Sequence, residues 1–206
     1  MQTKDHLALG LVLADRSGNW PLAEHRLAFL LGCAAPDWNV LTYLRGARSR
    51  RRICGHNFEN SLRVMERSLL GVQRDGLRTA VDFFRLGKML HYAADAFTWP
   101  HNDFWEAGIR AHRVYEAELH RRFRAALADD RFLLARDAPG LLAVYYNRAH
   151  RAYARAERGM ETDCRFIIRV CGSLLASCLD RAAVSFSEFY PQEVNLRESA
   201  YHHGLV

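Results

Sequence analysis

The sequence has little glycine and proline, and it lacks the alternating Val, Ile and Thr pattern of β-strands. Among its 206 residues there are 13 glycines and 5 prolines. No Pro-, Ser- or Gly-rich stretch divides the chain, and no internal repeat is visible. Apolar residues recur instead at the i, i+3, i+4 spacing of amphipathic helices. We therefore predict an all-α fold, a multi-helix bundle in which residues 1–206 form a single domain.

Long apolar runs and paired cysteines are also missing. The uncharged stretch at residues 27–36 is far shorter than the roughly 20 residues that a membrane span needs. The apolar run at residues 7–14 is short and has no small-residue cleavage site, so we expect no signal peptide. The cysteines number five and form no CxxC, which argues against a disulfide framework or a cysteine zinc site. These features predict a cytoplasmic protein with at most peripheral membrane contact.

The charge is basic, with a formal net charge of +6 at pH 7, and nearly all the basic residues are arginines. The densest arginine run lies at residues 45–52. Guanidinium groups suit phosphate, so an anionic substrate, an acidic membrane surface and nucleic acid are all compatible with this charge. A solvated loop is equally compatible, and the charge alone is therefore no strong evidence for a nucleic-acid partner.

The apolar spacing, together with Gly, Pro and Asp punctuation, divides the chain into helices. We expect Pro36 to lie in a turn at residues 35–38 and Pro100 to break or bend a helix. The predicted helices are residues 4–15, 19–33, 56–72, 75–97, 102–127, 140–158 and 160–189.

Two histidine–carboxylate pairs have the spacing at which one helical face presents both side chains. His91 and Asp95 are i, i+4, as are His112 and Glu116, and His101 lies between the pairs. The residues around His91 and Asp95 are strongly apolar, and burying an unpartnered carboxylate there would cost several kcal/mol. A bound metal ion would remove that cost and would also account for the histidine.

Near helix starts or turns, from which side chains can point into a bundle core, lie three further candidates, His6, Asp37 and His56. Each of them alone is more often a capping, surface or core residue than a ligand, but all the candidates taken together predict a multinuclear metal site. Zinc uses such donors, and iron or manganese in a helical bundle would use similar ones. The full candidate set is His6, Asp37, His56, His91, Asp95, His101, His112 and Glu116.

The segment at residues 87–101, with His91, Asp95 and the Pro100-His101 pair, resembles the signature of zinc-dependent phospholipases C. This family is related in fold to the P1/S1 single-strand nucleases. The pair His112 and Glu116 resembles a downstream element of the family, and residues 35–37 and 55–56 resemble two upstream elements.

The resemblance implies an all-α bundle that holds three zinc ions in a cleft and hydrolyses phosphodiesters with a metal-bound hydroxide. It assigns one zinc to Asp37, His56, His91 and Asp95, and a second to His101, His112 and Glu116. It assigns a third to His6, bridged by Asp95. Asp37 and Asp95 are the implied catalytic residues. The implied substrate is a phospholipid headgroup ester or a small phosphodiester.

The start of the chain departs from this family pattern. Secreted members complete the third zinc site with the amine and carbonyl of an N-terminal tryptophan, whereas this sequence begins Met1-Gln2. We therefore expect two or three zinc ions. The third site would be absent or weaker, or would be completed by another group such as Asp5 or water.

Three residues near the ligands are candidates for substrate binding: Asn57, Trp99 and Phe104. The aromatic side chains would stack on a base or hold a cationic headgroup, but core packing explains them at least as well. Asn57 would touch substrate or orient His56, or else cap a helix. Two other functions remain open, a P1/S1-like nuclease and a metal-binding protein without hydrolytic activity.

Overall fold

The computed structural model describes residues 1–18, 20–38, 58–129, 137 and 140–189. Within these ranges the chain is helical and contains no strand, which confirms the predicted all-α fold. None of the helices in these ranges is both long and apolar enough to cross a membrane. The elements are α1 (Thr3–Ser17), α2 (Ala23–Trp38), α4 (Phe58–Asp75), α5 (Ala80–Ala96), the 3-10 turn η1 (Trp99–His101), α6 (Ile109–Leu127), α8 (Leu142–Arg155) and α9 (Met160–Phe189).

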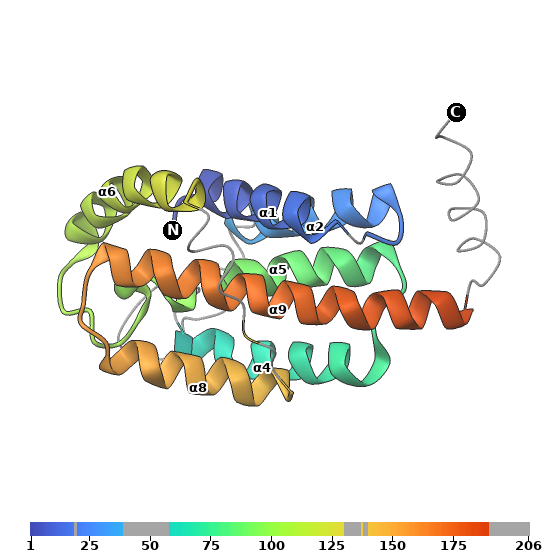
Figure 1. Cartoon of the computed structure of the whole chain (residues 1–206). Coiled ribbons are helices and arrows are strands. Elements are labelled where there is room, and N and C mark those ends of the chain that lie inside the picture. Colours follow the sequence, from blue (N-terminus) through green and yellow to red (C-terminus); the bar gives the residue numbers. More distant parts are fainter. Residues whose placement is uncertain (19, 39–57, 130–136, 138–139, 190–206) are drawn as a thin grey trace.

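Helix α5 lies at the centre of the bundle and packs against α2, α4 and α9 (Figure 1). Helices α1 and α2 lie side by side on one side of it, and α4 and α8 lie on the other. Helix α9 runs along the bundle and contacts α5, α6 and α8. The core is built from the apolar stripes of these helices, and it includes the three regularly spaced cysteines of α9, Cys164, Cys171 and Cys178, which are buried as free thiols.

Two glycines allow α2 and α5 to approach closely. A Cβ atom on Gly32 would lie 2.1 Å from the Phe84 carbonyl oxygen, and one on Gly87 would lie 2.0 Å from the Phe29 carbonyl oxygen. No side chain larger than hydrogen fits either position without moving the backbone. This close packing brings the end of α2 against the face of α5 that carries His91.

The prediction of a turn at residues 35–38 was wrong, because α2 continues through Pro36 to Trp38. Proline removes one backbone hydrogen bond and is normally costly inside a helix. Here it lies two residues before the end of α2, so little of the helix depends on the missing bond. The extensive packing of α2 on α5 outweighs this local preference.

Two other predicted helix starts were also wrong. Helix α4 ends at Asp75, and Gly76 has a positive φ of 70°. Helix α5 starts five residues later than predicted, behind a capping box in which Thr79 and Asp82 bond each other's backbone N–H groups. Residues 102–108 are not helical, and α6 begins only at Ile109.

Candidate metal centre

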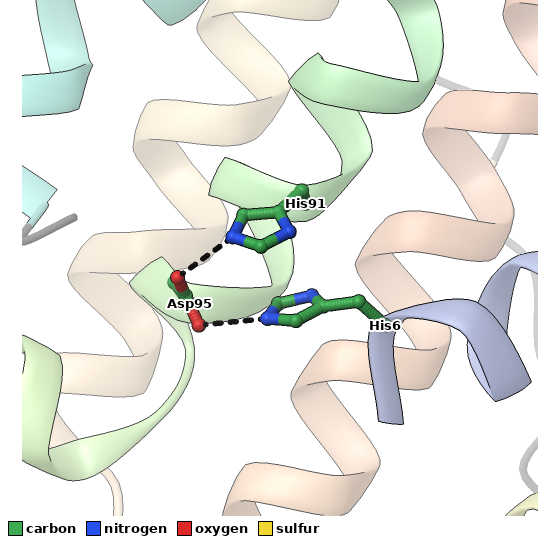
Figure 2. Close-up of side chains that lie close together, drawn as sticks. All are labelled: His6, His91 and Asp95. Atoms are coloured by element: carbon green, nitrogen blue, oxygen red, sulfur yellow. Dashed lines mark ion pairs between the residues drawn. The ribbon is translucent and has the colours of Figure 1, made fainter. Parts of the chain in front are cut away.

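The first ligand group joins α1 to α5. His6, His91 and Asp95 are all buried, and each offers one ligand atom within 4.8 Å of the others. His6 Nε2 lies 3.2 Å from Asp95 Oδ1, and His91 Nε2 lies 3.4 Å from Asp95 Oδ2 (Figure 2). The two imidazole rings are stacked, with their centroids 3.6 Å apart. One carboxylate thus faces two imidazoles from different helices.

A backbone carbonyl orients the His91 ring. His91 Nδ1 lies 2.8 Å from the Cys33 carbonyl oxygen at the end of the α2–α5 crossing. A carbonyl oxygen can only accept, so Nδ1 donates its proton, and in the neutral ring the lone pair is on Nε2. That lone pair faces Asp95 and also Asp37, whose Oδ1 is 3.6 Å away. This is the tautomer and orientation that a metal-binding histidine needs.

The second ligand group comes from η1 and α6. His101, His112 and Glu116 are half-buried and again place three ligand atoms within 4.8 Å of one another. Glu116 Oε1 lies 3.2 Å from His101 Nε2 and 3.1 Å from His112 Nε2. His101 Nδ1 lies 3.6 Å from Asp95 Oδ2, so Asp95 links the two groups.

The α-amino group of Met1 lies between the two groups. It is buried, 2.8 Å from Asp95 Oδ1, 3.0 Å from Glu116 Oε1 and 3.2 Å from His101 Nε2. Burial lowers the pKa of this amine, but Asp95 and Glu116 outweigh burial and raise it to about 11. Burial alone would raise the pKa of Glu116, yet the Met1 ammonium and the two histidines hold it well below its usual range.

The amino-acid sequence alone does not reveal this amino group as a candidate, because a backbone amine has no side-chain pattern. Asp5, the alternative suggested from the sequence, does not reach Asp95 or Glu116 by any contact found among the described residues. It accepts a hydrogen bond from the Gln2 backbone N–H at 3.3 Å and contacts His120 Nδ1. Asp5 and His120 therefore hold the first turn of α1, from which Met1 extends to the site.

The donor set fits a divalent cation. Both ring nitrogens of His6 are buried and form no hydrogen bond with the residues that the structure describes, although Nε2 faces a carboxylate oxygen. A buried polar atom without a partner is costly and rare. Burial, followed by the neighbouring His91, lowers the pKa of His6 to about 4, so the ring is neutral and has a lone pair at neutral pH. Neutral imidazoles facing carboxylates are the ligands that zinc, iron and manganese use.

The remaining predicted residues differ in how the structure places them. Asp37 lies in the last turn of α2, next to His91. His56 and Asn57 lie outside the described residues. Trp99 and Phe104 both have the Arg158 guanidinium over their rings, at 5.6 and 5.1 Å from the ring centroids, and their assignment to substrate binding stays a prediction.

One comparison with known proteins identifies a relationship. The family model described as "Zinc dependent phospholipase C" matches residues 5–160, which include every ligand candidate from His6 to Glu116. No curated protein and no solved structure matches the chain.

Proposed function

The chain belongs to the zinc-dependent phospholipase C family, and on this basis we propose that it hydrolyses phosphodiesters with a multinuclear zinc site. The observation that carries the proposal is the convergence of two histidine–carboxylate groups on Asp95. We propose a phospholipid headgroup ester or a small soluble phosphodiester as the substrate. Any contact with a membrane would be peripheral.

The described residues would divide between two main metal positions and a third beside Asp95. Asp37, His91 and Asp95 would hold one ion, with His56 added by the family resemblance, and His6 would face the third position together with Asp95. A second ion would be held by His101, His112 and Glu116. Bound zinc lowers the pKa of water and neutralises the charge on a phosphate, which is the chemistry that phosphodiester hydrolysis needs.

The two aspartates would have different roles because they differ in exposure. The side chain of Asp37 is 12% exposed, whereas that of Asp95 is 1% exposed. Water reaches Asp37, so it is the better acceptor for the proton of an attacking water molecule. Asp95 is closed off from solvent, and its part is to hold both ligand groups and the Met1 amine in one place.

We further propose that the Met1 amine takes the position that the N-terminal tryptophan amine occupies in secreted relatives. Its distances to Asp95, Glu116 and His101 support this role. The amine would have to lose its proton to bind a metal, so metal and proton compete for the same nitrogen. A third ion, or a further ligand to the second, would then depend on a free amino group at Met1.

Metal analysis and hydrolysis of a chromogenic phosphodiester test the proposed function together. We expect two or three zinc ions per chain and activity that is lost in Asp37→Asn. The matched control is Asp75→Asn, which changes an exposed aspartate at the end of α4 and should leave activity unchanged. Iron or manganese in place of zinc would overturn the metal assignment.

The same preparation separates the alternative functions. A fully zinc-loaded wild type that is inactive on all phosphodiesters would favour a metal-binding protein without hydrolytic activity. Comparison of short-chain phosphatidylcholine with single-stranded DNA would separate a phospholipase from a P1/S1-like nuclease. We expect the phospholipid to be the better substrate.

A further inference from the structure

A buried carboxylate outside both ligand groups connects the elements that carry the second group. Asp163 lies in the first turn of α9, beyond the last residue of the family match, and is 1% exposed. Its Oδ2 accepts hydrogen bonds from the Trp99 backbone N–H and the Tyr115 hydroxyl, both at 3.0 Å. Its Oδ1 accepts one from the Tyr153 hydroxyl at 2.7 Å. The three donors offset the cost of burying this charge.

Two of the three donors are close neighbours of metal-ligand candidates. Trp99 is the first residue of η1, the turn that ends in His101. Tyr115 directly precedes Glu116 on α6. Both bonds converge on one oxygen atom, so Asp163 sets the position of the turn that bears His101 relative to the helix that bears Glu116. The third donor, Tyr153, lies on α8, which carries no ligand candidate.

The other flank of His101 is held by separate contacts. Asn102 donates from Nδ2 to the carbonyl oxygens of Ala96 and Thr98, at 3.1 and 2.9 Å. Its Oδ1 accepts from His150 Nε2 at 2.8 Å. These bonds do not involve Asp163. We therefore expect the turn to keep its local shape when the Asp163 contacts are weakened, and its distance from α6 to change.

We propose that Asp163 is a positioning residue for the second metal group and acts through Trp99 and Tyr115. The proposal rests on the metal site of the proposed function. Among the described residues Asp163 itself contacts no metal-ligand candidate. It holds two ligand-bearing elements at the separation that lets His101 and Glu116 bind one ion. Loss of such a supporting contact typically weakens metal binding by about 10- to 100-fold.

Two tyrosine variants provide a matched test, because both remove one hydroxyl that donates to the same carboxylate. Zinc affinity is measured by chelator competition, and His112→Ala identifies which binding step belongs to the second group. We expect Tyr115→Phe to weaken that step by about 10-fold or more and to change the visible absorption of the Co²⁺-substituted protein. Tyr153→Phe should leave both readouts unchanged, although it lowers thermal stability as much. Equal effects of the two variants on zinc affinity would overturn the positioning role.

Substitutions of Asp163 give a second measurement. Asp163→Ala removes all three acceptors, whereas in Asp163→Asn one amide oxygen can still accept from both Trp99 and Tyr115. We expect weak zinc binding at the second group in the alanine variant and recovery of most of the affinity in the asparagine variant. If Asp163→Ala does not fold, the comparison of Tyr115→Phe with Tyr153→Phe still tests the positioning role of Asp163. A wild type that binds no zinc would instead overturn the proposed function, and a zinc-binding wild type with unaffected variants would overturn only the role of Asp163.

Discussion

The α-amino group of Met1 lies 2.8 Å from Oδ1 of Asp95, although the two residues are 94 positions apart in the chain. The same carboxylate faces His6, His91 and His101 at 3.2 to 3.6 Å. Asp95 is therefore the point at which α1, α5 and η1 meet. The Met1 ammonium balances part of the charge of this buried carboxylate, and the metal ions proposed above would be shared by the other groups that face it.

Asp95→Asn keeps the shape of the side chain but removes its charge. We expect the variant to lose metal from both groups and phosphodiesterase activity to fall by more than about 100-fold, since loss of a supporting contact alone costs up to about that much. Zinc per chain and initial rates are the measurements. The control is Glu118→Gln on the outer side of α6, where Glu118 pairs only with arginines among its described contacts and should tolerate the change. Full zinc content in Asp95→Asn would contradict the bridging role.

Extension of the chain by two residues before Met1 converts its amine into a peptide N–H, which can neither carry charge nor bind metal. We expect zinc affinity at the centre to weaken by about 10-fold or more. Intact mass of the unextended protein establishes first that the Met1 amine is free. An extended protein that binds zinc as tightly as the unextended one would exclude the amine as a ligand.

We also expect the stability of the metal-free unextended and extended proteins to depend differently on pH. The Met1 amine has its pKa raised from 8.0 to about 11 in the folded protein, so the folded state binds this proton more tightly than the unfolded state. The resulting stability is fully present below pH 8 and is lost as the pH rises towards 11. Urea unfolding in the presence of chelator should show this decline in the unextended protein. The extended protein should lack it, and parallel profiles would contradict the prediction.

Gly87→Ala should destabilise the protein by more than about 2 kcal/mol, because the new Cβ would overlap the backbone of α2. Separation of α2 from α5 would also weaken the bond between Cys33 and His91, so zinc affinity should fall too. Gly71→Ala on α4 is the control, since among the described residues no atom beyond its own turn of the helix lies within 4 Å of its Cβ position. That variant should be neutral or stabilising by up to about 1 kcal/mol. Equal unfolding free energies for the two variants would show that α2 and α5 are not closely packed.

His150 should make the protein sensitive to mild acid. Burial lowers the pKa of His150 from 6.5 to about 4, so its stabilising effect is present above pH 6.5 and is lost as the pH falls through 4. The metal-free wild type should have a higher free energy of unfolding than metal-free His150→Gln at pH 7. This difference should decrease by about 2 kcal/mol between pH 7 and pH 5. Urea unfolding at the two pH values measures this difference. A difference in unfolding free energy that does not change with pH would mean that His150 is not buried in its neutral form.

Features that depend only on residues close together in the sequence, namely the i, i+4 pairs and the last helix, were predicted correctly. The spacing of His91 and Asp95, and of His112 and Glu116, places each pair on one helical face, and both pairs lie there in the structure. The apolar periodicity also predicted the last helix, which the structure places at Met160–Phe189. These features follow from the 3.6-residue helical repeat and need no tertiary contact.

Local preferences failed at positions where tertiary packing or a competing cap decides. Pro36 signals a turn in isolation, but the packing of α2 on α5 keeps it inside a helix. The Asp75-Gly76 pair suggested a helix start, yet the Thr79–Asp82 capping box provides a better one four residues later. Single-residue signals are weak compared with the burial of a whole helical face.

The sequence by itself therefore determined the helical fold, the residue types of the candidate metal centre and its two histidine–carboxylate pairs, because these depend on spacing within one or two turns. Only the tertiary structure decided that His6 and the Met1 amine lie against the same oxygen of Asp95, and that Asp163 connects η1 to α6. The physical reason is that contacts between distant segments depend on how closely the helices pack. At this site the close packing of α2 and α5 depends on two glycines, Gly32 and Gly87, because a side chain at either position would overlap the backbone of the other helix.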